Sequence, residues 1–201
     1  MYVTVNREIT PLTVTFFMKL VVLLTTLLAF QNVSATQFDI IAERAKDGDA
    51  FAQYRLGKRF EFGTGVTANT REAFKWYRKS AKQGLVFAQF TLGNQYKFGN
   101  GVPESDIKAV TWYRRAAKQG HIGAQFNLGT MYFNGDGIPE NGVKAYVWWT
   151  MAKTQGRKGT KASIEVVKDK MTVNQEVKGQ ALAAQCYSSN YKNCSKLQPS
   201  N

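Results

Sequence analysis

Side chains that could do chemistry are few in this 201-residue chain, and the clearest pattern is Ser-x-x-Lys. It occurs at Ser105 to Lys108 and at Ser189 to Lys192, a spacing that some β-lactamases use to activate a serine nucleophile. The companion motifs of those enzymes are missing, and Ser105 could equally begin a helix. His121 is the only histidine and is expected at a variable surface position. The sequence therefore predicts no catalytic residue.

Metal and phosphate chemistry is also disfavoured. One His and two Cys are too few for a typical zinc site, which takes four ligands drawn mainly from those types, so we expect no metal and no cofactor. Three Gly-x-Gly pairs could suggest a phosphate loop. Each follows a predicted helix and lacks the third glycine, so helix-ending turns are favoured.

Cys186 and Cys194 form an even pair near the end of the chain. In an exported protein such a pair predicts a disulfide. The small loop it closes should add about 2 kcal/mol of local stability and hold Tyr191 and the tail against the last helix. The alternative, a redox-active pair, normally has the spacing C-x-x-C.

The N-terminus carries an export pattern. Lys19 precedes an eleven-residue, mainly apolar run from Leu20 to Phe30, and Val33-Ser34-Ala35 has small residues at its end. This pattern predicts a signal peptide over residues 1–35, cleaved after Ala35, and a periplasmic or secreted protein. Met18 is a second candidate for the initiator. An uncleaved anchor is the alternative, although the run is shorter than the roughly 20 residues of a membrane-spanning helix.

The charge balance restricts the class of partner. The chain has 27 Lys and Arg against 14 Asp and Glu, a formal net charge of +13. Such a basic protein in the cytoplasm could bind nucleic acid, but an exported one instead meets anionic envelope polymers, lipid headgroups or acidic proteins. We therefore expect no nucleic-acid partner.

Three segments of 36 residues, 48–83, 84–119 and 120–155, align without a gap. Internal repetition of this length is typical of helical solenoids. The columns identical in all three are headed by Gly48, Ala52, Gln53, Leu56, Gly57, Gly63, Gly65, Ala73, Trp76 and Gln83.

Each repeat is predicted to hold two helices. Ala52, Leu56 and Phe60 share one face of the first helix, and Gly57 in its middle predicts that a neighbouring backbone comes close. Glycines at the Gly63 column should end this helix. The N-caps of the second helices are expected to be Asn69, Ser105 and Asn141. Residues 36–47 should form an N-terminal capping helix, and residues 156–201 C-terminal capping helices with the disulfide-bonded tail.

The repeat pattern, A-x-x-x-L-G-x-x-[YF]-x-x-G-x-G-V-P-x-x-x-x-K-A-x-x-W-[YW]-x-x-A-A-x-x-G, resembles the Sel1-like repeat, a relative of the tetratricopeptide repeat. The second repeat matches it through Ala88, Leu92, Gly93, Tyr96, Gly99, Gly101, Val102, Pro103, Lys108, Ala109, Trp112, Tyr113, Ala116, Ala117 and Gly120. The resemblance implies an all-α, α/α solenoid (superhelix) of helix-turn-helix repeats that acts as an adaptor between proteins, including envelope complexes. Some secreted relatives have been linked to β-lactam binding and hydrolysis, but this chain lacks the paired cysteines that mark their repeats.

Two surfaces are candidates for binding. The first helices should line the concave side of the superhelix, where the variable columns are Arg55, Lys58, Arg59, Thr91, Asn94, Gln95, Asn127, Thr130 and Met131. A basic edge at the ends of the second helices comprises Arg78, Lys79, Lys82, Arg114, Arg115 and Lys118. The concave columns could be a solvated face without function, and cations at helix ends are stabilised by the helix dipole alone.

The functional prediction is a secreted or periplasmic, non-enzymatic adaptor or scaffold that binds a protein partner on its concave face. A cationic module for an anionic envelope polymer or membrane surface is the first alternative. A weak β-lactam-binding or hydrolysing protein is the second.

Overall fold

A computed structural model describes residues 18–25, 38–189, 191 and 194. Helices cover 18–25 and 38–46 and then form a regular series. The series is α2 (Ala50–Phe62), α3 (Thr70–Lys82), α4 (Val86–Phe98), α5 (Asp106–Lys118), α6 (Ile122–Asn134), α7 (Gly142–Thr154), α8 (Thr160–Lys168) and α9 (Val173–Ser188). The predicted cleavage after Ala35 and the lysine of the second Ser-x-x-Lys pattern lie outside the described residues.

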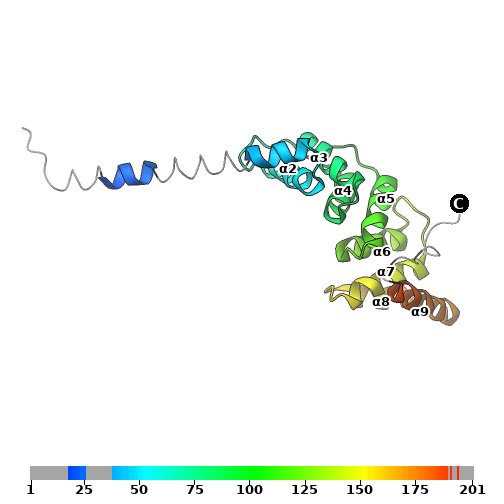
Figure 1. Cartoon of the computed structure of the whole chain (residues 1–201). Helices are drawn as coiled ribbons and strands as arrows, with labels where there is room; N and C mark the ends of the chain where they lie inside the picture. Colours follow the sequence, from blue (N-terminus) through cyan, green and yellow to red (C-terminus); the bar gives the residue numbers. More distant parts are fainter. Residues whose placement is uncertain (1–17, 26–37, 190, 192–193, 195–201) are drawn as a thin grey trace, which may run out of the picture.

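Consecutive helices pack as pairs, and the pairs stack in chain order. The second helix of each repeat, α3 or α5, contacts the first helix of the next, α4 or α6. Figure 1 shows the pairs following one another along an arc, with α4 on its inner side and α5 on its outer side. The described part of the chain contains no strand. The prediction of an all-α solenoid is confirmed.

The ends of the helices follow from local sequence. The second helices begin at the predicted N-caps, whose side-chain oxygens each accept a hydrogen bond from a backbone N–H three residues later, at Asn69, Ser105 and Asn141. The first helices end at residues with left-handed φ angles of 68°, 69° and 79°, which are Gly63, Gly99 and Gly135. A side chain at such a φ is strained, so glycine is favoured.

The recurring mid-helix glycine has a different neighbour from the one predicted. A Cβ added to Gly93 would lie 2.6 Å from the ring of Tyr113, and one on Gly57 would lie 2.7 Å from the ring of Tyr77. Gly129 meets Trp149 in the same way. The prediction of a close backbone was wrong, because an aromatic side chain of the paired helix occupies that space.

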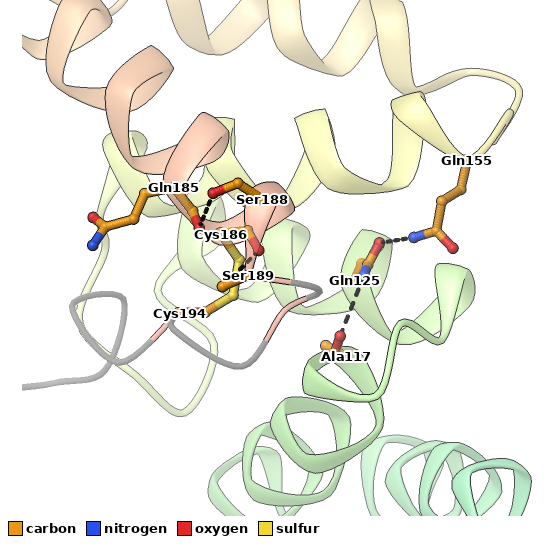
Figure 2. Close-up of a disulfide and its surroundings, with 8 residues drawn as sticks. All are labelled: Ala117, Gln125, Gln155, Gln185, Cys186, Ser188, Ser189 and Cys194. Atoms are coloured by element: carbon orange, nitrogen blue, oxygen red, sulfur yellow. Dashed lines mark hydrogen bonds between the residues drawn. A yellow bond between two sulfur atoms is a disulfide. The ribbon is translucent and has the colours of Figure 1, made fainter.

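Buried glutamines connect the repeats. The Gln89 amide Nε2 donates to the Ala81 carbonyl at 3.2 Å, and Gln119 Nε2 donates to Gln89 Oε1 at 2.8 Å. Gln125 joins Ala117 and Gln155 in the same way, as Figure 2 shows. The sequence identified these columns as invariant but gave them no role.

The same bond explains the N-terminal capping helix. Gln53 Nε2 donates to the carbonyl of Ala45, which takes the place that Ala81 and Ala117 have in later repeats. Ile41 and Ala45 are buried against Leu56. Helix 38–46 therefore acts as a lone second helix that covers the first repeat.

At the other end, α8 and α9 pack on α7, and Cys186 and Cys194 form a disulfide with a Cα–Cα distance of 4.9 Å. Figure 2 places this disulfide at the end of α9. The Tyr191 backbone N–H donates to the Cys186 carbonyl at 2.9 Å, as the sequence predicted for this residue, whereas most of the tail lies outside the described residues. The Tyr191 ring also lies against Gly120, at the start of the third repeat.

Within the described residues, no helix combines the length and hydropathy needed to cross a membrane. The disulfide fits an oxidising compartment, because such bonds are rare in the reducing cytoplasm. Cleavage of the signal peptide stays a prediction.

Candidate binding face

The predicted concave residues divide into exposed and buried side chains. Arg55 and Lys58 are exposed on α2, whereas Gln95 and Met131 are each only 2% exposed. Gln95 and Met131 occupy the same repeat column as Arg59. This column lies three residues after a buried leucine, at the border of the core. The long side chain of Arg59 can extend outward from there, but an uncharged Gln or Met folds inward. Gln95 and Met131 therefore cannot contact a partner, and this part of the prediction is corrected.

The first helices present a row of aromatic side chains that the sequence analysis missed. We define the aromatic row as Phe51, Tyr54, Phe87, Phe90 and His121. Tyr54 lies 6.5 Å from Phe51 and 6.3 Å from Phe87, measured between ring centroids. His121 lies 6.0 Å from Phe87 and stacks on Phe90 at 4.2 Å. The row extends over all three repeats. Its most exposed members, Phe51 and Phe87, are 54% and 48% exposed.

The helical spacing of Phe51 and Phe62 on α2 could have revealed part of this face. On α2, Phe51, Arg55, Lys58 and Phe62 occur at i, i+4, i+7 and i+11, which places them along one stripe. The corresponding stripes are Phe87, Thr91, Asn94 and Phe98 on α4, then Gly123, Asn127, Thr130 and Asn134 on α6. The face therefore changes from aromatic and cationic in the first repeat to small and polar in the third.

Polar side chains that α4 and α6 contribute to this face form hydrogen bonds within the protein. Asn94 Oδ1 accepts a hydrogen bond from the Tyr113 hydroxyl at 2.7 Å and one from Asn127 Nδ2 at 3.5 Å. The Thr130 hydroxyl donates to the Phe126 carbonyl at 3.2 Å. Burial raises the pKa of Tyr113 to about 12, so its hydroxyl stays a donor at neutral pH. These residues stabilise the neighbouring helices and offer a partner fewer free groups than expected.

His121 is more than a variable surface residue, which corrects the expectation. It is the N-cap of α6, and its Nδ1 accepts from the Ala124 backbone N–H at 3.2 Å. Only the neutral imidazole can accept there, which places the proton on Nε2. Burial lowers the pKa of His121 and favours this neutral form.

The basic edge is partly engaged in aromatic contacts. The Lys79 ammonium lies 4.0 Å from the centroid of the Trp76 ring, and the Arg115 guanidinium lies 4.5 Å from that of Trp112. Arg114 is half-buried, with Nη2 3.5 Å from the Tyr132 hydroxyl. The exposed members are Arg78, Lys79, Lys82 and Arg115, while Lys118 is half-buried. These contacts give several of the cations a structural role besides any binding role.

The serine motifs have structural partners. Ser105 Oγ accepts from the Lys108 backbone N–H at 3.4 Å as the cap of α5, and the Lys108 ammonium lies over the Tyr96 ring, 5.4 Å from its centroid. Ser189 Oγ donates to the Cys186 carbonyl at 2.9 Å. Among the described residues, no group of three or more His, Cys, Asp or Glu is placed to hold a metal ion.

Stacked helix pairs with one exposed inner face define a helical-repeat solenoid, a fold class that commonly presents binding surfaces. The model of the Sel1 repeat matches residues 50–85, 86–121 and 122–156, each match starting two residues after the start used in the sequence alignment. These matches cover more than half of the chain, and the chain belongs to the Sel1 repeat family. Sel1 repeats are typical of protein–protein interaction modules and are generally non-enzymatic.

Two solved structures are similar. The crystal structure of a Sel1 repeat protein from Oxalobacter formigenes shares 35% identity with a TM-score of 0.61, covering 64% of this chain and 97% of that protein. The structure of c5321, a protective antigen of uropathogenic Escherichia coli with an SLR fold, shares 30% identity with a TM-score of 0.69. That match covers 82% of this chain but 36% of the antigen. No curated protein shows significant similarity to the chain.

Proposed function

We propose that this protein is an exported, non-enzymatic adaptor that binds a protein partner on the face formed by α2, α4 and α6. The aromatic row is the observation that supports the proposal. Its rings contact one another across three repeats, and Phe51 and Phe87 remain about half exposed. A contiguous exposed apolar surface is uncommon on a soluble monomer and often marks an interaction site.

The test is affinity co-purification of the protein from crosslinked cell envelope of its native host. In the variant Phe51→Ala/Phe87→Ala, we expect the captured partner to fall by about tenfold or more, because aromatic side chains carry much of the energy of interfaces. The control variant is Ile107→Ala/Val173→Ala, which removes two exposed apolar side chains from α5 and α9. Equal capture by the wild type and both variants would overturn the proposal.

The basic edge supports a second candidate, a module for anionic envelope polymers or membrane surfaces. Arg115→Glu/Lys118→Glu tests it, since reversing these charges should strongly reduce binding to vesicles that contain anionic lipid. That binding should also weaken as salt is added. Binding that does not depend on salt would rule this candidate out.

β-Lactam hydrolysis is the least supported candidate, because Ser105 already serves as the cap of α5. Turnover of a chromogenic β-lactam by pure protein, abolished by Ser105→Ala, would be needed to establish it.

A further inference from the structure

The first repeat contains a hollow of about 450 Å³ on the inner stripe of α2. Its lining combines aromatic and cationic side chains and includes no carboxylate. The lining residues are Phe51, Tyr54, Arg55, Lys58, Arg59, Phe62 and Thr64.

In the apolar part of this hollow, the central ring is held by neighbouring rings, and the flanking rings remain exposed to solvent. The Tyr54 ring packs against the buried Tyr77 ring at 5.5 Å and against Phe87 at 6.3 Å, which holds it in place. Phe51 and Phe62 on either side are 54% and 68% exposed. A space of this size between rings suits one apolar side chain of a ligand.

The proposed contacts use two cations of the hollow, Arg55 and Lys58. Among the described residues, neither Arg55 nor Lys58 forms an ion pair with a carboxylate. The nearest acid along the chain, Glu61, is turned away, since its Oε2 accepts from the Tyr77 hydroxyl at 2.6 Å. Arg55 and Lys58 are three residues apart on one helix face, so a single acidic segment can approach both.

The occupant should be an extended segment of another protein. The hollow continues into the aromatic row on α4, which gives an elongated track and not an isolated cavity. A second copy of this chain is disfavoured at this place, because a protein of net charge +13 repels itself at a cationic surface. Charge complementarity instead favours an acidic partner.

We propose that the first-repeat hollow binds an acidic peptide segment, with one apolar side chain inserted between Phe51 and Phe62 and flanking carboxylates at Arg55 and Lys58. This inference rests on the proposed adaptor function and names the chemistry of its partner. The third repeat, with small polar side chains at the same columns, is not expected to share this preference.

A random library of short peptides displayed on phage tests this preference directly with the purified protein. Peptides selected by the wild type should be enriched in Asp and Glu around a Phe, Leu or Trp. For the best peptide, Arg55→Glu/Lys58→Glu should weaken the measured Kd by about tenfold or more. The matched control Arg71→Glu/Lys161→Glu makes the same change in charge on exposed positions of α3 and α8, outside both candidate surfaces, and should change the Kd by less than about twofold.

Arg55→Gln/Lys58→Gln provides a second, milder variant if charge reversal disturbs folding, and it should lie between the wild type and the reversed variant. Selected peptides without acidic enrichment would overturn the inference, as would equal weakening by the α2 variant and the control variant. The adaptor function is judged separately by the Phe51→Ala/Phe87→Ala co-purification. If that variant loses its partner while the peptides show no acidic preference, the inference fails and the adaptor function stands.

Discussion

Gly93 shows how one missing side chain positions a pair of helices. The glycine lets the Tyr113 ring lie across α4, where its hydroxyl reaches Asn94. Gly57 and Gly129 have the same relation to Tyr77 and Trp149, so the recurrence of this glycine has a packing reason. The cost of a helical glycine, about 1 kcal/mol relative to alanine, is offset by this contact.

We expect Gly93→Ala to lower the free energy of unfolding by about 2 kcal/mol. The added Cβ would lie 2.6 Å from a fully packed ring, and overpacking of about 3 kcal/mol exceeds the gain in helix propensity of about 1 kcal/mol. Denaturant unfolding measures the change. The control is Thr91→Ala on the same helix, which should have little effect. A stabilised Gly93→Ala protein would contradict this account.

His121 should make stability depend on pH. Its pKa is lowered by burial, so the neutral form is favoured in the folded state. Its contribution, about 1 kcal/mol for a cap, is therefore present above the unfolded pKa of about 6.5 and is lost as pH falls through the folded pKa. Thermal unfolding of the wild type and His121→Asn between pH 7.5 and 5 checks this, since Asn caps a helix without titrating. An equal loss of stability in both proteins would refute it.

At the scale of elements, the repeats are joined by a polar seam as well as by apolar packing. Each buried glutamine connects the first helix of a repeat to the carbonyl of an alanine in the preceding second helix. At each end of the solenoid, where a neighbouring repeat is missing, other helices cover the exposed side. Helix 38–46 supplies that carbonyl at the N-terminal end, and α8 and α9 pack on α7 at the C-terminal end.

Removing the disulfide should loosen α9 without unfolding the repeats. In Cys186→Ser/Cys194→Ser we expect a loss of about 2 kcal/mol, mainly as faster amide exchange in α9, because the bond closes only a short loop. Exchange in α2 to α5 should be unchanged. A reducing agent should have the same effect on the wild type and none on the variant. Two free thiols in protein from the native compartment would disprove the structural role of this bond.

At the scale of the molecule, excess positive charge should limit stability. The net charge is +13, and every side chain in the ion pairs between described residues is at least 27% exposed, so water and salt weaken these attractions. Raising the ionic strength from about 0.01 M to about 0.1 M shortens the screening length from about 30 Å to about 10 Å, so the Tm should rise. Arg71→Gln/Lys82→Gln removes two exposed cations and should reduce this dependence on salt. A Tm that falls with salt would show that attractive ion pairs dominate.

The sequence alone determined the period, the class of fold, the N-caps of the second helices, the helix-ending glycines and the disulfide. These features depend on contacts between residues close in the chain or on a pattern repeated three times. Both can be recognised in the sequence without knowing how distant segments pack. The helical spacing of Phe51 and Phe62 is also present in the sequence, but only the structure shows that both rings are exposed.

Only the tertiary structure decided which inner columns reach solvent. Gln95 and Met131 share a column with Arg59, yet they turn into the core, since exposure depends on side-chain length and on neighbouring helices. The role of Gly57 likewise required the position of Tyr77, twenty residues away in the sequence. The aromatic row forms because stacking brings Tyr54, Phe87 and His121 from three separate helices into contact, and no single segment of the sequence contains that arrangement.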